Sequence, residues 1–462
     1  MNFEKMIVLN PGDNYKFIAE VPASTSDEID QKIVDAHPAF RIWSEYSVQQ
    51  RIIFLEKLYI AFDNRKEEIA KLIATEMGMP ISIAMKIDIE VGLQYFQDYL
   101  KNAEHWLEFE IVFENQQEKH TLYFESLGIV VASTPWNYPF TNFIWAVIPN
   151  LIVGNTIVVK HSENCVLTSQ LLEQIFISCN LPDNICGFVY GQGHDAGDYL
   201  INSAVDMIWF TGSIATGHHV YQVAASRDIP VLLELGGSAP GIIFEDVDID
   251  NVIKSIFIYR FLNSGQTCDA LKRLIVHHSI FNQVVEKLSN FLAQQKIGTP
   301  LDSSTQLGPL ANKKQLNMIE LQVEDAVSKG AKIICGGKQP QGLLGAYYQP
   351  TIITNVSRYM KVWSEEVFGP VLPIVSFTTQ EEAIDLANDT IFGLGGYIYT
   401  NDKNRALEVA KKLKTGNISI NGTNYVIAED PFGAYKRSGI GREHGKLGLQ
   451  ELCQKKLIVI NK

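Results

Sequence analysis

A cysteine with nucleophilic potential ends residues 263–268, which read NSGQTC. The segment follows an apolar run at 256–262, so the sulfur of Cys268 is expected at the end of a packed element. Cysteine is a strong nucleophile because part of it is thiolate near neutral pH, and a helix N-terminus or a nearby cation increases that part. Most free cysteines are simply small buried apolar residues. This segment alone therefore leaves both roles open.

Length and charge restrict the class of protein. A chain of 462 residues is too long for one hydrophobic core, so two domains with a small appendage are expected. Apolar residues make up 46% and charged residues 20%, which is typical of globular proteins. The net charge of −13 argues against a nucleic-acid partner or an anionic membrane, which would require a basic face.

The sequence lacks the patterns typical of membrane-spanning, secreted and metal-binding proteins. No apolar run approaches the ~20 residues that span a bilayer, and residues 1–20 do not resemble a signal peptide. We therefore expect a soluble, cytoplasmic protein without a membrane partner. The six cysteines form no C-x-x-C pair, and no histidine stands at metal-ligand spacing. Neither a disulfide framework nor a metal site is expected.

The N-terminal part reads as helical. Apolar residues recur at three- and four-residue spacing through 26–45 and 48–77. The sequence Gly-Met-Pro at 78–80 is a stop signal, and a further helix is predicted from 81 to about 106.

Strand and helix patterns alternate in the rest of the chain. From Gly128 onward, short β-branched runs alternate with helix-length segments, which predicts a parallel sheet covered on both faces. A second series begins near Pro240. Residues 119–125 alternate as in an exposed hairpin arm, and 456–460 form a lone strand.

Four segments stand together in a revealing order: PWNYPF at 135–140, ELGG at 234–237, GQTC at 265–268 and EEVFGP at 365–370. With FTGS at 210–213 and PFGAYKRSG at 431–439, they resemble the NAD(P)-dependent aldehyde dehydrogenase superfamily. The resemblance covers nearly the whole chain. In length and in the Lys-His-Ser step at 160–162, the chain looks most similar to the short bacterial branch resembling succinate-semialdehyde dehydrogenases.

The resemblance implies an α/β fold with a Rossmann-like cofactor domain, an α/β catalytic domain and a small β oligomerisation arm. The cofactor domain is expected at 1–107 and 127–236, the catalytic domain at 237–437, and the arm at 108–126 and 450–462. An isolated strand pair cannot bury its faces, so the arm should pair across subunits in a homodimer or homotetramer.

The resemblance also assigns three catalytic roles. Cys268 is the nucleophile that forms a thiohemiacetal and then a thioester. Asn137 and the Cys268 backbone N–H stabilise the oxyanion, and Glu234 activates water for hydrolysis. Taken alone, Asn137 reads as a turn residue and Glu234 as a surface acid at a strand end.

By the same resemblance the cofactor is NAD, with NADP as the alternative. Glu163 is expected to accept from the adenosine ribose, where a carboxylate repels a 2′-phosphate, so NAD is favoured. Phe368 is expected at the nicotinamide, although it also reads as an ordinary core residue. The complete set of predicted cofactor contacts is Trp136, Lys160, Glu163, Gly212, Ser213, Glu366 and Phe368.

The small-molecule substrate is an aldehyde, and branch resemblance favours succinate semialdehyde. Two departures oppose this, because Ala146 and Leu262 stand where relatives carry basic residues. Arg260, Lys272 and Arg273 are the nearest cations, with orientations that the sequence does not fix.

The alternatives are a medium-chain or aromatic aldehyde, an acylating enzyme that uses coenzyme A, and a non-catalytic structural homologue. Acylating relatives typically lack the carboxylate at the position of Glu234. Intact Cys268, Glu234 and Asn137 argue for catalysis with water as acceptor.

Overall fold

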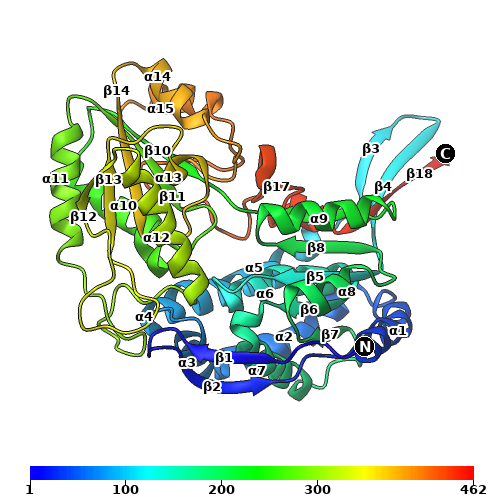
Figure 1. Cartoon of the computed structure of the whole chain (residues 1–462). Coiled ribbons are helices and arrows are strands. Elements are labelled where there is room, and N and C mark those ends of the chain that lie inside the picture. Colours follow the sequence, from blue (N-terminus) through cyan, green and yellow to red (C-terminus); the bar gives the residue numbers. More distant parts are fainter.

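A six-stranded sheet, ordered β17-β9-β8-β5-β6-β7, forms the centre of one half of the protein (Figure 1). The computed structural model describes all 462 residues. All neighbours in this sheet pair in parallel except β17, which is antiparallel to β9. The bounds are β5 (Ile129–Thr134), β6 (Thr156–His161), β7 (Cys186–Val189), β8 (Met207–Thr211), β9 (Val231–Glu234) and β17 (Gly439–Ile440).

Helices cover both faces of this sheet, which explains its continuous apolar strands. In β5, Val130 and Ala132 pack into one apolar cluster, while Ile129 and Val131 pack into another. This period of two places alternate residues on opposite faces, and both faces are buried. The prediction of a parallel sheet covered on both sides is confirmed.

The N-terminal helices agree with the sequence pattern except at one break. A single helix was expected across 48–77, but the backbone leaves helical geometry at Arg65. The apolar spacing continues across this break, so the pattern does not reveal it. The bounds are α1 (Ser26–Trp43), α2 (Val48–Asn64), α3 (Lys66–Glu76), α4 (Ile81–Ile83), the π-helical turn η1 (Ala84–Ile89) and α5 (Glu90–Trp106).

The connections within the first sheet are also helical. They are α6 (Pro139–Val153), η2 (Glu163–Cys165), α7 (Val166–Ser178), η3 (Gly193–Gly197), α8 (Asp198–Ile201) and α9 (Ile214–Ala225).

A seven-stranded sheet, ordered β12-β13-β14-β11-β10-β15-β16, forms the other half. It is parallel except for the β12–β13 pair. The bounds are β10 (Ala239–Ile243), β11 (Leu271–His277), β12 (Lys332–Cys335), β13 (Thr351–Thr354), β14 (Val371–Phe377), β15 (Tyr397–Tyr399) and β16 (Ser419–Ile420). Its helices are α10 (Ile249–Phe261), η4 (Leu262–Gly265), α11 (Phe281–Leu292), α12 (Lys313–Ser328), α13 (Lys361–Ser364), α14 (Gln380–Asn388) and α15 (Lys403–Lys412).

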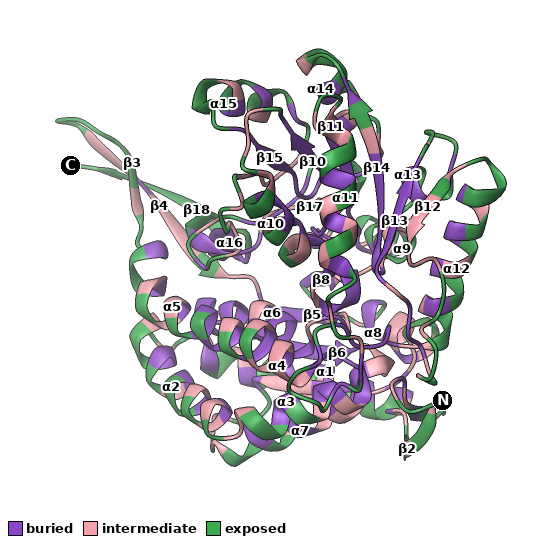
Figure 2. Ribbon diagram, turned by 90° about the vertical axis from the view of Figure 1, so that its left-hand side faces the viewer, coloured by how far each residue is buried: buried purple, intermediate pink, exposed green.

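A three-stranded arm projects from the body, with the C-terminus near its tip (Figure 1). It consists of β3 (Glu110–Glu114), β4 (Glu118–Ser126) and β18 (Cys453–Asn461), paired antiparallel. Two short segments, η5 (Lys436–Ser438) and α16 (Gly445–Glu451), precede β18. The arm is mostly exposed, in contrast to the buried core (Figure 2). Pairing of the hairpin with the C-terminal strand agrees with the sequence prediction.

An N-terminal hairpin of β1 (Met6–Asn10) and β2 (Lys16–Val21) was not predicted from the sequence. Its apolar residues Met6, Val8 and Val21 pack against Val166 at the start of α7. No helix of the chain combines the length and apolar character needed to cross a lipid bilayer.

The strand order places a ligand crevice between β5 and β8. The chain runs outward from β5 to β6 and β7 on one side, and then returns through β8 and β9 on the other. In open parallel sheets, ligands bind at this switch point, beyond the carboxyl ends of the strands. Residues 135–137 follow β5 directly, and Gly212 and Ser213 follow β8, so both segments lie at this edge.

Candidate active site

The loop that carries Cys268 has an unusual left-handed backbone. Asn263, Ser264 and Gly265 have φ of 50°, 52° and 76° after the end of α10. Such a conformation costs roughly 1–3 kcal/mol at a non-glycine residue, so the surrounding structure must hold it. A Cβ on Gly265 would stand 2.4 Å from the Gly369 carbonyl oxygen, which explains the glycine.

The loop after β5 lies against this nucleophile loop. Asn137 Nδ2 donates to the Gln266 carbonyl at 3.2 Å, and Asn263 Nδ2 donates to the Asn137 carbonyl at 2.8 Å. The hydroxyls of Tyr138 and Thr267 share a hydrogen bond of 2.9 Å. These contacts join segments far apart in sequence, and they place the Asn137 amide beside the peptide groups that lead to Cys268.

Cys268 is partly exposed, and its thiol is neutral at rest. Burial raises its pKa well above the usual value, and Asp269 adds to this, while Lys272 acts in the opposite direction. We expected a helix N-terminus or a cation to favour the thiolate. A cation is present, but burial outweighs it, and the chain continues into strand β11 rather than a helix. The thiol must therefore lose a proton before it reacts.

Glu234 ends strand β9 as an unpaired buried acid. It is 3% exposed, and neither carboxyl oxygen has a hydrogen-bond partner. Burial raises its pKa well above the usual value, and the nearby Glu443 raises it further. Burial also raises the pKa of Glu443. Sequence reasoning missed Glu443, because it reaches the cavity from a segment close to the C-terminus.

Glu366 and Phe368 lie on the other side of the nucleophile. Glu366 Oε1 accepts hydrogen bonds from the Gly237 N–H at 3.1 Å and from Lys272 Nζ at 2.5 Å. The Phe368 ring meets Trp136 edge to face, with centroids 5.5 Å apart at 87°. Phe368 is therefore a lining residue rather than core.

The N-terminus of α9 supplies backbone donors. Ser213 caps this twelve-residue helix by accepting from the Thr216 N–H at 3.3 Å. The Gly212 N–H donates to the Glu234 carbonyl at 2.9 Å, which fixes this turn beside the base. A helix start of this kind attracts phosphate groups.

Lys160 and Glu163 lie apart, at the end of β6. Lys160 is 2% exposed, donates to the His161 carbonyl at 3.1 Å, and lies 3.9 Å from Glu163. β6 neighbours β5, and Lys160 is in register with Ser133, so this pair belongs to the same carboxyl edge. The edge offers a donor and acceptor for a ribose, a helix start for a pyrophosphate, and a carboxylate beside a phenyl ring. These features fit NAD.

A cavity of about 770 Å³ brings eight of the ten predicted site residues together: Trp136, Asn137, Gly212, Ser213, Glu234, Cys268, Glu366 and Phe368. Only Lys160 and Glu163 stand outside its lining. Seven aromatic residues contribute to the wall: Trp136, Tyr138, Trp145, Tyr259, Phe368, Tyr397 and Phe432. The charges are unbalanced. Lys314 is the one basic residue, against the five acids Glu234, Asp269, Glu365, Glu366 and Glu443.

The arginines closest in sequence to the nucleophile do not face this cavity. Arg260 is fully buried and donates to the backbone carbonyls of Val367 and Val371. Arg273 is also fully buried and donates to carbonyls at the end of α14. Leu262 does line the cavity, whereas Ala146 lies in the core. The described site thus has no arginine for a substrate carboxylate.

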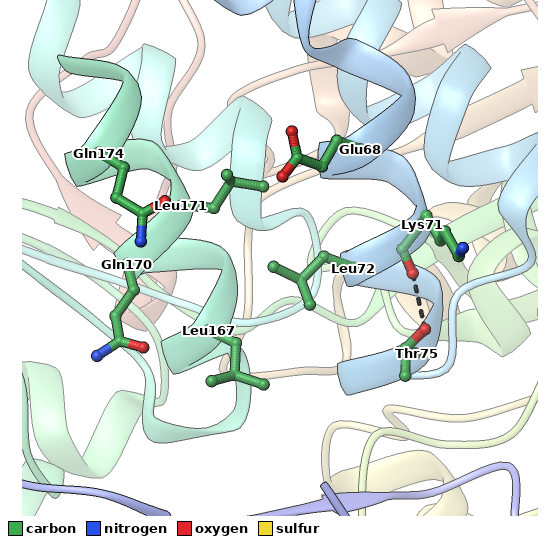
Figure 3. A pocket seen from close by; sticks show the side chains of 8 residues that line it. All are labelled: Glu68, Lys71, Leu72, Thr75, Leu167, Gln170, Leu171 and Gln174. Atoms are coloured by element: carbon green, nitrogen blue, oxygen red, sulfur yellow. Dashed lines mark hydrogen bonds between the residues drawn. The ribbon is translucent and has the colours of Figure 1, made fainter. Parts of the chain in front are cut away.

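A second hollow of about 370 Å³ lies between α3 and α7 (Figure 3). Leucines from both helices form its floor, and polar side chains stand at its rim. It contains no nucleophile and no charged group in a buried setting. We do not assign the chemistry to it.

Comparisons with known proteins show the family of this chain. The profile described as "Aldehyde dehydrogenase family" matches residues 2–458. Aminoaldehyde dehydrogenase 1, peroxisomal, from Pisum sativum is 36% identical over 97% of this chain and 91% of its own. Succinate-semialdehyde dehydrogenase, mitochondrial, from Arabidopsis thaliana is 36% identical over 99% of this chain and 86% of its own.

A crystal structure of a point mutant of betaine aldehyde dehydrogenase from Staphylococcus aureus in complex with NAD⁺ has the same fold. It superposes with a TM-score of 0.94 at 32% identity, and the match covers 99% of this chain and 94% of that chain. The predicted superfamily and fold are therefore confirmed, whereas the predicted branch is not, because relatives named for different aldehydes match about equally well. The chain belongs to the aldehyde dehydrogenase family and is an NAD(P)-dependent aldehyde dehydrogenase.

Proposed function

We propose that this enzyme oxidises its aldehyde through covalent chemistry on Cys268. The thiolate attacks the aldehyde carbon, and the carbonyl oxygen becomes the oxyanion of a thiohemiacetal. The Asn137 amide and the Cys268 backbone N–H donate to that oxyanion, and such a donor contributes about 3–4 kcal/mol to the transition state. Bound NAD supplies the hydride acceptor. The proximity of Asn137 to the nucleophile loop supports this role.

Glu234 is proposed to act in the second half of the reaction. It removes a proton from water as the water attacks the thioester, and the acid and the free thiolate are released. A base is most effective when its pKa lies near the working pH, and burial shifts Glu234 in that direction. Because both carboxyl oxygens lack a protein partner, they are available to a water molecule.

For the substrate we propose an aldehyde with a cationic group, such as an ω-amino aldehyde. The observation that carries this is the excess of acidic groups in the cavity, with five acids and one lysine among its lining residues. The faces of aromatic rings attract cations. The cavity wall is rich in aromatic side chains, among them Tyr138, Trp145 and Phe432. Relatives named for aminoaldehydes and betaine aldehyde support the same class.

Succinate semialdehyde, predicted from the sequence, is the second candidate. A relative of that name is 36% identical over nearly the whole chain. Its far carboxylate would have to find Lys314 or backbone donors, since burying an unpaired carboxylate costs several kcal/mol. A neutral medium-chain or aromatic aldehyde would suit the aromatic wall without using its charge.

Two variants test the chemistry. Cys268→Ala should lower NADH production by more than about a thousandfold while NAD still binds, because the sulfur is the covalent centre. Glu234→Gln should release about one NADH per site on rapid mixing and then turn over slowly, because only hydrolysis is impaired. Retained turnover in the first variant, or the absence of a burst in the second, would contradict these roles.

A substrate panel tests the class. The kcat/KM values for 3-aminopropanal, butanal and succinate semialdehyde should be compared at one pH and one ionic strength. We expect the amino aldehyde to lead by tenfold or more, about 1.4 kcal/mol in transition-state binding. A higher kcat/KM for succinate semialdehyde would support the substrate predicted from the sequence and refute the proposed cationic aldehyde.

A further inference from the structure

Lys272 is a fully buried lysine whose ammonium contacts both the nucleophile loop and Glu366. Its Nζ donates to the Cys268 carbonyl at 2.8 Å, to the Gly237 carbonyl at 2.8 Å, and to Glu366 Oε1 at 2.5 Å. An ammonium group has three N–H donors, so all of them are used. The same nitrogen lies 5.2 Å from the centroid of the Phe368 ring.

These partners differ in kind from those of an ordinary buried cation. Arg273, the next residue, is equally buried, but its guanidinium binds only backbone carbonyls and stacks on Trp363. Lys272 instead connects the peptide of the nucleophile to a carboxylate that lines the cavity. It does not line the cavity itself, so it has no direct contact with an aldehyde in our assignment.

We propose that Lys272 is a positioning residue that couples the cofactor side of the site to the nucleophile, by holding Glu366 and Cys268 on one ammonium. The proposal rests on the proposed role of Cys268. Two effects follow from the contacts. The positive charge next to the Cys268 peptide favours the thiolate over the thiol, and the ion pair fixes the direction in which Glu366 presents its carboxylate.

Without Lys272, both groups lose their restraint. Glu366 Oε1 would retain only the Gly237 N–H, so its carboxylate could turn away from the nicotinamide side. The Cys268 and Gly237 carbonyls would lose the one donor that joins them. Buried acceptors left without a donor are destabilising, so lower stability alone would not prove the proposal. Its test needs a readout on the thiol.

The test is alkylation of Cys268 by iodoacetamide across pH 6–10, with and without NAD and with no aldehyde present. Cys268→Ala gives the background from the five other cysteines. Lys272→Met is close in length and uncharged, and it should slow alkylation near neutral pH by about tenfold or more. It should also weaken NAD binding by about tenfold, measured by fluorescence quenching. Lys272→Arg keeps the charge and should restore most of the thiol reactivity.

Arg273→Met is the matched control, because it also removes a buried cation. It should lower the melting temperature without changing the pH profile of alkylation. A Lys272→Met protein that melts lower but alkylates and binds NAD like the wild type would reduce Lys272 to a structural role. A wild type that oxidises no aldehyde would overturn the proposed function instead, and the alkylation result would still stand by itself.

Discussion

Replacing Asp269 by Asn should weaken the selection of cationic aldehydes. Asp269 follows the nucleophile directly, lines the cavity and is 8% exposed. Its Oδ2 accepts a hydrogen bond from the Tyr425 hydroxyl at 2.9 Å. An asparagine has the same shape, and its carbonyl oxygen can accept the same bond. The substitution therefore removes a charge and leaves the packing intact.

The size of the effect follows from the position of the substrate. Asp269 is adjacent to Cys268, so we take about 6 Å as the working distance between this carboxylate and the ammonium of a three-carbon chain bonded to Cys268. Two opposite charges at that distance attract by about 3 kcal/mol at an effective dielectric constant of about 20. This corresponds to a loss of up to ~100-fold in kcat/KM for 3-aminopropanal. Burial raises the pKa of Asp269, so the full effect requires a pH at which it is ionised.

A neutral substrate should respond in the opposite direction. Asp269 raises the pKa of the Cys268 thiol, so its removal makes the thiolate easier to form. The kcat/KM for butanal should therefore stay constant or rise in Asp269→Asn, while that for 3-aminopropanal falls. NADH absorbance, measured with both substrates from pH 6 to 9, gives the ratio of kcat/KM for 3-aminopropanal to kcat/KM for butanal. In the wild type this ratio should increase with pH, because Glu234, Asp269 and Glu443 have pKa values raised by burial and ionise as the pH increases.

The refuting result is a parallel change. If Asp269→Asn lowers the activity toward both aldehydes by the same factor, the carboxylate positions the loop rather than selecting charge. Tyr425→Phe serves as a control at the upper end of this pH range, since it removes the hydrogen bond that lowers the pKa of Asp269 but keeps the carboxyl group.

Three further predictions concern the base, the cofactor and the arm. Glu443→Gln removes a like charge that raises the pKa of Glu234, so the increase of kcat with pH should move to lower pH. An unchanged pH profile would show that Glu443 does not influence the ionisation of Glu234 during turnover. Glu163→Ser should increase kcat/KM for NADP relative to NAD by about five- to tenfold, because a partly exposed carboxylate no longer repels the 2′-phosphate. Val112→Glu places a charge on the exposed apolar arm and should convert the predicted homodimer or homotetramer to smaller species in light scattering.

Local chemistry made much of this structure predictable. The strands of the parallel sheets were visible as short β-branched runs, because residues buried on both faces leave a continuous apolar signature. β14 (Val371–Phe377) is one such run, and its first four residues are buried. The nucleophile loop was recognisable only together with the segments at 135–140, 234–237 and 365–370, because residues 263–268 alone left Cys268 open as a nucleophile or a buried apolar residue.

What the sequence did not reveal depends on contacts between distant segments. Nothing near Glu443 indicates that it stands beside Glu234, because the pair meets only when β17 joins the edge of the first sheet. Lys272 reads as the first charged residue of a strand, and only Glu366 and the Cys268 carbonyl give it a function-related position. The break at Arg65 is hidden for a different reason, since the apolar spacing continues through it.

The selection of a charged substrate and the ionisation of the Cys268 thiol both depend on the same acidic groups of this cavity. Burial raises the pKa of both Cys268 and Glu234; Asp269 raises both further, and Glu443 also raises that of Glu234, so ionisation of either group adds a negative charge beside other acids. A cation bound among these groups offsets that charge, so it favours the thiolate needed for attack and then the carboxylate needed for hydrolysis. An anionic tail would do the opposite and raise both barriers. Under the proposed function, the acids of the wall would therefore act on the substrate twice, first by attracting a cationic aldehyde and then by making its charge part of the activation of Cys268.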